Sequence, residues 1–133
     1  IAYLGLDDLR TRFLDELSGG QCQRAFVAMV LAQDTKYVLL DEPLNSLDMK
    51  HAAAMMKLLR RTADELTKSI TVVIHDINFA SIYADHVVAM RDGRVMLEGG
   101  AVDLMQETML KDIYDTVVKV REVDGHRLGL HYL

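Results

Sequence analysis

The fold is decided by the stretch Leu17-Ser18-Gly19-Gly20-Gln21-Cys22-Gln23-Arg24 and by Tyr37-Val38-Leu39-Leu40-Asp41-Glu42-Pro43, which follows it in the chain. The first stretch has a Ser-Gly-Gly turn before a helical pattern. Such a turn offers backbone N–H groups and the positive end of a helix dipole to an anion. The second stretch is an apolar run that ends in two carboxylates, one suited to a hydrated metal ion and one to a water molecule that is to be activated. Together they indicate chemistry on a nucleotide phosphate.

Four motifs resemble those of the ATP-binding cassette (ABC) ATPases. Leu17–Arg24 resembles the signature motif of this family, and Val38–Pro43 resembles its Walker B strand with the catalytic glutamate. Asn45-Ser46-Leu47-Asp48 is similar to the D-loop, and His75, after the apolar run Ile70–Ile74, is similar to the switch histidine. Four motifs in the family's order are more specific than any one of them. The resemblance covers essentially the whole chain, but only the carboxyl-terminal half of such a domain.

The resemblance implies a role for each motif. Asp41 would hold Mg²⁺, mostly through water, and Glu42 would act as general base on the attacking water. His75 would contact the γ-phosphate and help to position that water, and Asp48 would communicate across a dimer. The signature motif would contact the γ-phosphate of ATP held by the opposite subunit. Its candidate residues are Ser18, Gly19, Gly20 and Gln21.

These residues also have ordinary structural interpretations. Ser18 could be a helix N-cap with a loop before it, and Asp48 could cap the next helix whether or not it belongs to a D-loop. The two carboxylates could be a solvated pair, and a lone histidine is often just a polar strand end. Cys22 departs from the family, which usually places a polar or basic side chain there. No chemistry is assigned to the remaining histidines, which are His51, His86, His126 and His131.

The sequence pattern predicts an α/β fold, a partial P-loop NTPase fold of the ABC type with buried parallel strands and antiparallel hairpins. Tyr37–Leu40 has no alternation, so we expect it to be buried on both faces of a parallel sheet with Ile70–Ile74. One or two short helices are expected within Ile1–Leu17. The other predicted helices are Gln21–Gln33, with Phe26, Val27, Val30 and Leu31 as its apolar positions, Asp48 to about Leu66, Ile77–Ala84, Val102–Met105 and Thr108–Tyr114. The apolar stripe of the long second helix would be Ala52, Met55, Met56, Leu59, Ala63 and Leu66.

Two hairpins are predicted toward the carboxyl end. Asp92-Gly93 between Val87–Met90 and Arg94–Leu97 is a strong two-residue hairpin signal. Asp124-Gly125-His126 is expected to join Val117–Val123 to Arg127–Tyr132. In that last strand Leu128, Leu130 and Tyr132 alternate with other residues. We expect one domain with three regions, namely 1–36 with the signature motif, 37–100 with the Walker B, D-loop and switch-histidine motifs, and 101–133 with the final helices and hairpin.

The sequence has no match to G-x-x-x-x-G-K-[ST], the loop that wraps nucleotide phosphates. In the family this loop, an aromatic that stacks on adenine and a glutamine loop lie amino-terminal to the signature motif. We therefore expect the 133-residue polypeptide alone to bind ATP weakly and to be inactive. In the family the strand that carries the phosphate loop lies between Ile70–Ile74 and Val87–Met90. Because an open gap leaves unpaired backbone groups, we expect it to be filled by strand closure, another chain or the missing half.

Composition narrows the functional classes. The formal net charge is −5, which argues against a nucleic-acid surface. A single cysteine cannot form an internal disulfide and fits a reducing compartment. The longest apolar run, Ala25–Ala32, is far shorter than the roughly 20 residues that span a bilayer, so no direct membrane insertion is expected. No signal peptide is visible, and a start at Ile1 without methionine suggests a piece of a longer protein.

The resemblance implies the ATP-hydrolysing subunit of a transporter, with ATP and Mg²⁺ as cofactors. Its partners would be a second ATPase subunit in a nucleotide-bridged dimer and transmembrane permease subunits. It would be cytoplasmic and peripheral on the inner face of the cell membrane. Asp41–His51, His75–Ala80 and Val120–Arg127 look most like importers of iron–siderophore complexes. The alternatives are a soluble, non-transport ABC ATPase and a non-catalytic fragment that dimerises.

Overall fold

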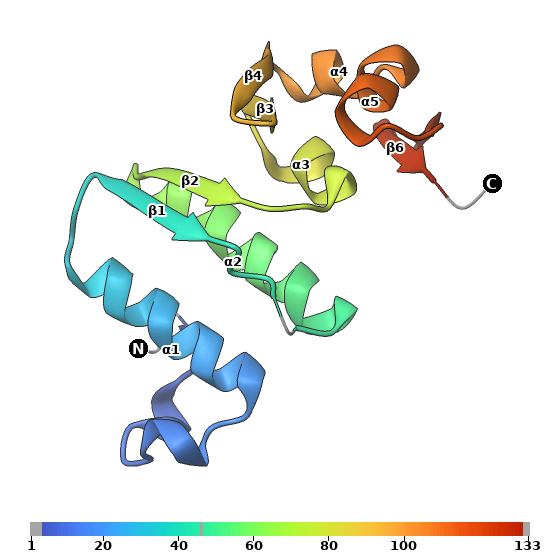
Figure 1. The fold of residues 1–133 in the computed structure, drawn as a ribbon. Helices are drawn as coiled ribbons and strands as arrows, with labels where there is room; N and C mark the ends of the chain where they lie inside the picture. Colours follow the sequence, from blue (N-terminus) through green and yellow to red (C-terminus); the bar gives the residue numbers. More distant parts are fainter. Residues whose placement is uncertain (1–3, 46, 132–133) are drawn as a thin grey trace. The chain divides into compact units, whose positions relative to one another are not determined.

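The computed structural model describes residues 4–45 and 47–131 of the chain. The chain divides into two compact units, one up to Ile74 and one from His75 onward, and each is described by itself. The boundary lies inside the region 37–100. The first unit contains η2 (Asp7–Leu9), η3 (Leu14–Glu16), α1 (Gly19–Ala32), β1 (Tyr37–Asp41), α2 (Met49–Leu66) and β2 (Ser69–Val73) (Figure 1). The second contains α3 (Ile77–Tyr83), β3 (Val87–Arg91), β4 (Arg94–Gly99), α4 (Ala101–Leu104), α5 (Glu107–Tyr114), β5 (Lys119–Val123) and β6 (His126–Leu130).

In the first unit, β1 and β2 form a parallel pair joined by α2, as the sequence predicts. The register places Val38 beside Ile70 and Leu40 beside Val72. Helix α2 packs against β2. Its buried residues are Ala52, Met55, Met56, Leu59 and Thr62. Thr62 was not in the predicted stripe, and it is accommodated because its Oγ1 donates a hydrogen bond to the Leu58 carbonyl at 2.9 Å.

The prediction that β1 is buried on both faces is wrong. Val38 and Leu40 are 4% and 8% exposed, whereas Tyr37 and Leu39 are each 70% exposed. The strand therefore alternates, because only the face that carries Val38 and Leu40 is covered within the unit. Fewer residues of helix α1 are buried than predicted, since Val27 is its only buried residue and Phe26 is exposed.

In the second unit, a core brings together residues from α3, α4, α5 and the segment before β5. Its buried members are Ile77, Leu104, Met105, Leu110 and Val118. Both predicted hairpins form, and in each the loop has two left-handed residues, as a type I′ turn requires. Their φ angles are 50° and 74° at Asp92 and Gly93, and 51° and 79° at Asp124 and Gly125. His126 is therefore the first residue of β6 and not part of the loop.

Strand β6 departs from the alternation expected at Leu128, Leu130 and Tyr132. Gly129 is buried, Leu130 is exposed, and Tyr132 lies outside the described residues. The cause is close packing of the strand on α3, because a Cβ at Gly129 would collide with Cδ1 of Ile77 and lie 3.1 Å from Cγ1 of Val118. A glycine is therefore needed at the buried position.

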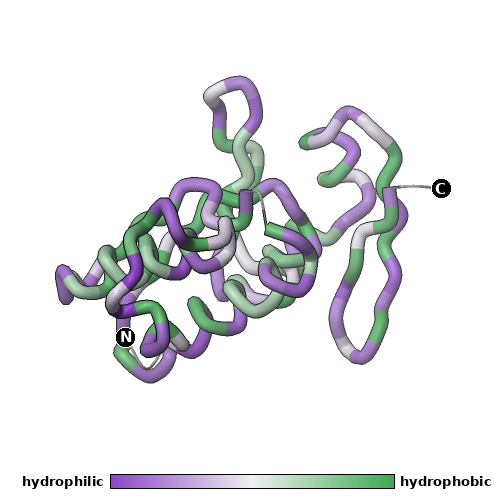
Figure 2. The backbone as a smooth tube through the Cα atoms, turned by 90° about the horizontal axis from the view of Figure 1, so that it is seen from below, coloured by the Kyte–Doolittle hydropathy of each residue, from purple (hydrophilic) through white to green (hydrophobic). Residues whose placement is uncertain are grey.

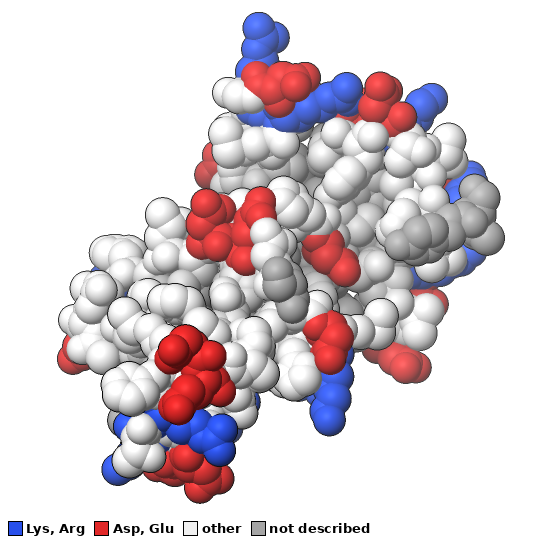
Figure 3. Space-filling model, turned by 60° about the horizontal axis from the view of Figure 1, so that its bottom comes forward, with Lys and Arg blue, Asp and Glu red and all other residues white. Residues whose placement is uncertain are grey.

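The described strands form three separate two-stranded sheets, β1–β2, β3–β4 and β5–β6. Because β2 belongs to the first unit and β3 to the second, the expectation that the gap between Ile70–Ile74 and Val87–Met90 is filled stays a prediction. Hydrophilic and hydrophobic residues are interspersed along the backbone (Figure 2). No described helix is long and apolar enough to cross a membrane. On the face shown in Figure 3, acidic side chains form several separate groups with Lys and Arg among them or at the margins.

Candidate functional site

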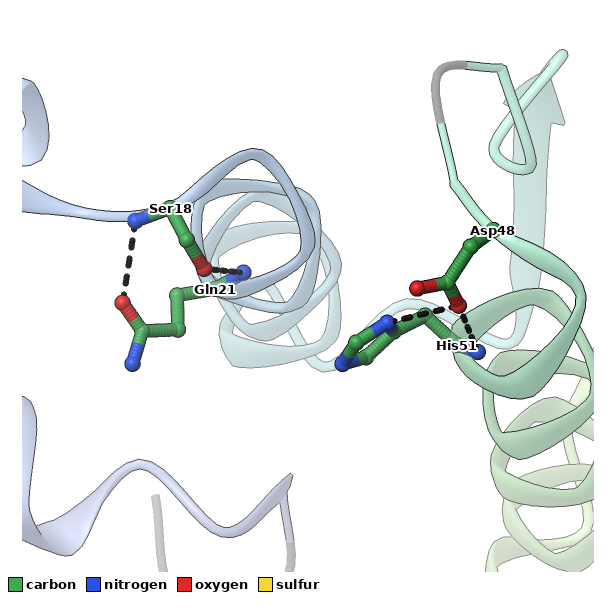
Figure 4. A network of polar contacts seen from close by, with 4 residues as sticks. All are labelled: Ser18, Gln21, Asp48 and His51. Carbon is green, nitrogen blue, oxygen red and sulfur yellow. Dashed lines mark hydrogen bonds and ion pairs between the residues drawn. The ribbon is translucent and has the colours of Figure 1, made fainter.

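The signature turn begins α1, and Ser18 is its N-cap. The Gln21 N–H donates to Ser18 Oγ at 3.4 Å, and the Ser18 N–H donates to Gln21 Oε1 at 2.9 Å, which is a reciprocal capping box (Figure 4). The helix therefore starts at Gly19, two residues before the predicted Gln21. The capping interpretation of Ser18 is confirmed, and the cap takes up the Gln21 N–H but not those of Gly19 and Gly20, which have no partner within the helix. A Cβ at Gly19 would meet nothing within 4 Å, so a phosphate could approach this turn closely.

The carboxyl end of β1 presents the two candidate acidic residues in different ways. Asp41 is the last strand residue and is exposed. Glu42 is half-buried and lies beyond the strand, with a left-handed φ of 47°. Its N–H donates to the Val73 carbonyl at 3.0 Å, which ties the residue to the end of β2. A non-glycine residue held in this region carries roughly 1–3 kcal/mol of strain, and such strain is concentrated at functional sites.

Asn45 holds the Glu42 side chain. Its amide Nδ2 donates to Glu42 Oε2, and its backbone N–H donates to the Glu42 carbonyl at 3.1 Å. Pro43, between them, is fully buried. The turn after β1 therefore fixes both the backbone and the carboxylate of the candidate general base.

Asp41 is the candidate ligand for Mg²⁺, and its surroundings contain few other protein ligands. Among residues 4–45 and 47–131, no group of three or more His, Cys, Asp or Glu side chains is arranged to hold a metal ion. One exposed carboxylate fits a magnesium ion that keeps most of its water and is held mainly by substrate phosphates.

The D-loop residue Asp48 caps α2, as predicted. Its Oδ1 accepts the His51 N–H at 2.8 Å and is also 2.8 Å from His51 Nδ1 (Figure 4). The pKa of Asp48 is lowered, first by the hydrogen bond from the His51 backbone and then by the one from its side chain. Ser46 of the same motif lies outside the described residues.

The structure brings the signature turn and the D-loop together within the first unit. A Cβ at Gly20 would lie 3.4 Å from Cδ2 of His51 and 3.7 Å from Cδ2 of Leu47, so Gly20 faces both side chains. Gly20, Leu47 and His51 also line an open cavity of about 460 Å³, together with Arg24 and Met55. Sequence reasoning missed His51. The signal that could have found it is its position three residues after Asp48, where a side chain can reach the cap.

His75 is the first residue of the second unit and is exposed. Its carbonyl accepts a hydrogen bond from Tyr114 Oη at 3.4 Å. The pKa of Tyr114 is raised by burial and, secondarily, by the charge of Asp76. Asp76 caps α3 by accepting the N–H groups of Asn78 and Phe79. The segment that carries His75 is thus anchored on both sides, whereas its ring is exposed.

A Ser-Gly-Gly turn beside the cap of α2, with an acidic strand end between them in sequence, is typical of the ABC class of ATP-binding domains. The protein family described as "ABC transporter" matches residues 1–45. The chain is part of an ABC transporter ATP-binding domain, with the mixed α/β fold that was predicted.

Similar proteins of known name indicate which members of this class the chain resembles. The chain is 51% identical over 132 residues to the petrobactin import ATP-binding protein YclP of Bacillus subtilis, covering 99% of this chain and 52% of YclP. It is 52% identical over 120 residues to the petrobactin import protein FatE of Bacillus anthracis, covering 90% of this chain and 48% of FatE. It is 39% identical over 110 residues to the ferric enterobactin transport protein FepC of Escherichia coli, covering 83% of this chain and 41% of FepC. The chain thus spans about half the length of these relatives.

Two solved structures share the fold. One is an inward-facing conformation of a putative metal-chelate type ABC transporter, with a TM-score of 0.87 and 23% identity over 98% of this chain and 54% of that chain. The other is CbiO1 from Clostridium perfringens, part of the ABC transporter complex CbiONQ. Its TM-score is 0.73, with 33% identity over 84% of this chain and 44% of that chain.

Proposed function

We propose that the full-length protein is the ATP-hydrolysing subunit of an ABC transporter and that it powers import of an iron–siderophore complex. The observation that carries this proposal is the 51% identity to a petrobactin import ATP-binding protein along 99% of the chain. The placement of Gly20 opposite the side chains of Leu47 and His51 supports it, because it brings together the two motifs that would face a partner subunit.

Each candidate residue has a distinct part in the proposed reaction. Ser18, Gly19, Gly20 and Gln21 would bind the γ-phosphate of ATP held by a second ATPase subunit. Asp41 would hold Mg²⁺, which when bound neutralises phosphate charge. Glu42, fixed by Asn45, would take a proton from the attacking water, and His75 would help to position that water. Asp48 would carry the state of one site to the other subunit.

The proposed partners are a second ATPase subunit and transmembrane permease subunits, with the protein held at the inner face of the cell membrane in the cytoplasm. The 133-residue chain alone is proposed to be inactive, because its sequence has no lysine-bearing phosphate loop. The transported compound is proposed to be petrobactin or a similar iron chelate, since YclP and FatE are both petrobactin import proteins.

The test uses the full-length protein with its permease in membrane vesicles. Glu42→Gln keeps the shape of the side chain but removes the base. We expect ATP affinity to be retained while ATP turnover falls by about 10²-fold or more and uptake of iron–petrobactin stops. His75→Ala should have the same effects.

The matched control is Glu98→Gln, an exposed carboxylate in β4 that pairs with His86. Its turnover should match that of the unchanged protein. Normal ATP turnover in Glu42→Gln would contradict the catalytic assignment. Normal turnover without uptake of any iron chelate in the unchanged protein would contradict the transport assignment and leave the ATPase intact.

A further inference from the structure

We propose that His51 is a positioning residue that couples the signature turn to the D-loop, an inference that rests on the proposed function. Its ring occupies the space between two motifs that are far apart in the sequence. One side faces Gly20 in the first turn of α1 across the space that a Cβ there would fill, and the other bonds to Asp48 at the start of α2. Figure 4 shows the ring projecting from α2 toward the helix that carries Ser18 and Gln21.

The hydrogen bonds fix the orientation of the ring. A carboxylate only accepts hydrogen bonds, so His51 Nδ1 carries a hydrogen and donates it to Asp48 Oδ1 at 2.8 Å. The same oxygen accepts the His51 N–H at 2.8 Å. The side chain is therefore held at both its backbone and its ring, which leaves little rotational freedom.

The ring carbons supply the second half of the coupling. Cδ2 and Cγ of His51 would lie 3.4 and 3.5 Å from a Cβ at Gly20, so no more than the space of one methyl group separates the ring from the glycine. Cδ2 of Leu47 would lie 3.7 Å from the same Cβ. Residues on both sides of Asp48 thus support the turn. A shift of the D-loop in response to a partner subunit would move the ring, and the ring would move the backbone N–H groups that meet the γ-phosphate.

This arrangement predicts a particular kinetic effect. The signature turn acts on ATP that the partner subunit holds, so loss of the coupling affects the closed dimer and not the binding of ATP to one subunit. We expect His51→Ala in the full-length protein to lower kcat by about tenfold, the change that corresponds to one hydrogen bond to a charged group, with KM for ATP unchanged. Alanine is the better helix former, so a weaker α2 would not explain the loss.

Two further variants separate the contacts. His51→Asn keeps a donor near Asp48 but removes the ring, and His51→Phe keeps a ring beside Gly20 but removes the donor. Each should fall between the unchanged protein and His51→Ala. The control is His86→Ala, which removes another exposed histidine that pairs with a carboxylate, Glu98, and should leave kcat unchanged.

Hydrogen–deuterium exchange of the amides in 18–22 gives a readout that does not depend on activity. In His51→Ala these amides should exchange about tenfold faster than in the unchanged protein. Unchanged exchange, or faster exchange with an unchanged kcat, would overturn the proposal, as would a rise in KM alone. If the unchanged protein has no ATPase activity, the proposed function fails, and the exchange measurement still decides whether His51 supports the turn.

Discussion

At the scale of the residue, single side chains form hydrogen bonds with backbone groups that no neighbouring strand pairs. Asn78 in α3 is the clearest case, because its amide binds both backbone groups of one residue in β6. Asn78 Nδ2 donates to the Gly129 carbonyl at 3.2 Å, and the Gly129 N–H donates to Asn78 Oδ1 at 2.7 Å. The side chain thereby closes the outer edge of β6 at a buried glycine.

Asn78→Ala should therefore destabilise the second unit. It leaves the N–H and the carbonyl of a buried residue without these partners, and each such group costs roughly 1–3 kcal/mol. We expect the free energy of unfolding to fall by about 2 kcal/mol, measured by urea denaturation. Ser81→Ala is the control, because Ser81 Oγ donates to the carbonyl of Arg127, an exposed residue that water can reach instead. Equal losses in the two variants would contradict the role of Asn78.

At the scale of the element, caps determine where helices begin, and they make stability depend on pH. The Asp48 carboxylate caps α2, and its pKa is lowered from its ordinary 3.8 by the His51 hydrogen bonds. A lowered folded-state pKa means that this stabilisation is fully present above about 3.8 and is lost as the pH falls through the folded-state value. The cap therefore weakens in acid.

Asp48→Asn separates the charge from the cap. Asparagine still offers an oxygen to the His51 N–H but cannot ionise. We expect the variant to be less stable than the unchanged protein at neutral pH, and the difference to shrink as the pH falls below 3.8 and to disappear below the lowered folded-state pKa of Asp48. Urea denaturation at a series of pH values measures it. A difference that stays constant down to that pH would show that the Asp48 charge does not stabilise the helix.

The elements themselves could be predicted because their signals are local. Apolar spacing and an Asp cap defined α2, and Asp92-Gly93 and Asp124-Gly125 defined the two hairpins. Contacts between distant segments could not be predicted in this way. Two examples are the placement of the His51 ring opposite Gly20 and the hydrogen bond between Asn78 and Gly129. Both depend on which faces of the elements meet after folding. Periodicity does not contain that information.

At the scale of the whole molecule, β1 is another case in which the local sequence pattern does not show which faces are covered. Its uninterrupted apolar sequence is typical of a strand that is covered on both sides, yet Tyr37 and Leu39 are exposed on one face. Their cross-strand neighbours on that face, Ser69 and Thr71, are also exposed. The sequence pattern of β1 thus fits a larger assembly than this chain. Relatives such as YclP are about twice as long, since the chain covers 52% of YclP.

We therefore expect Leu39 to be buried in the full-length protein, and Leu39→Asp there tests this. A carboxylate placed in a covered apolar layer without a partner should lower the free energy of unfolding by about 3 kcal/mol or more. Leu40→Asp, on the face that is already covered in this chain, should cost a similar amount, whereas Met49→Asp, at a position that is 85% exposed, should have little effect. Urea denaturation of the three variants compares them directly. If Leu39→Asp lowers the free energy of unfolding as little as Met49→Asp does, the expectation is wrong. The face of β1 that carries Leu39 would then stay in water in the full-length protein, and packing would not explain the apolar run.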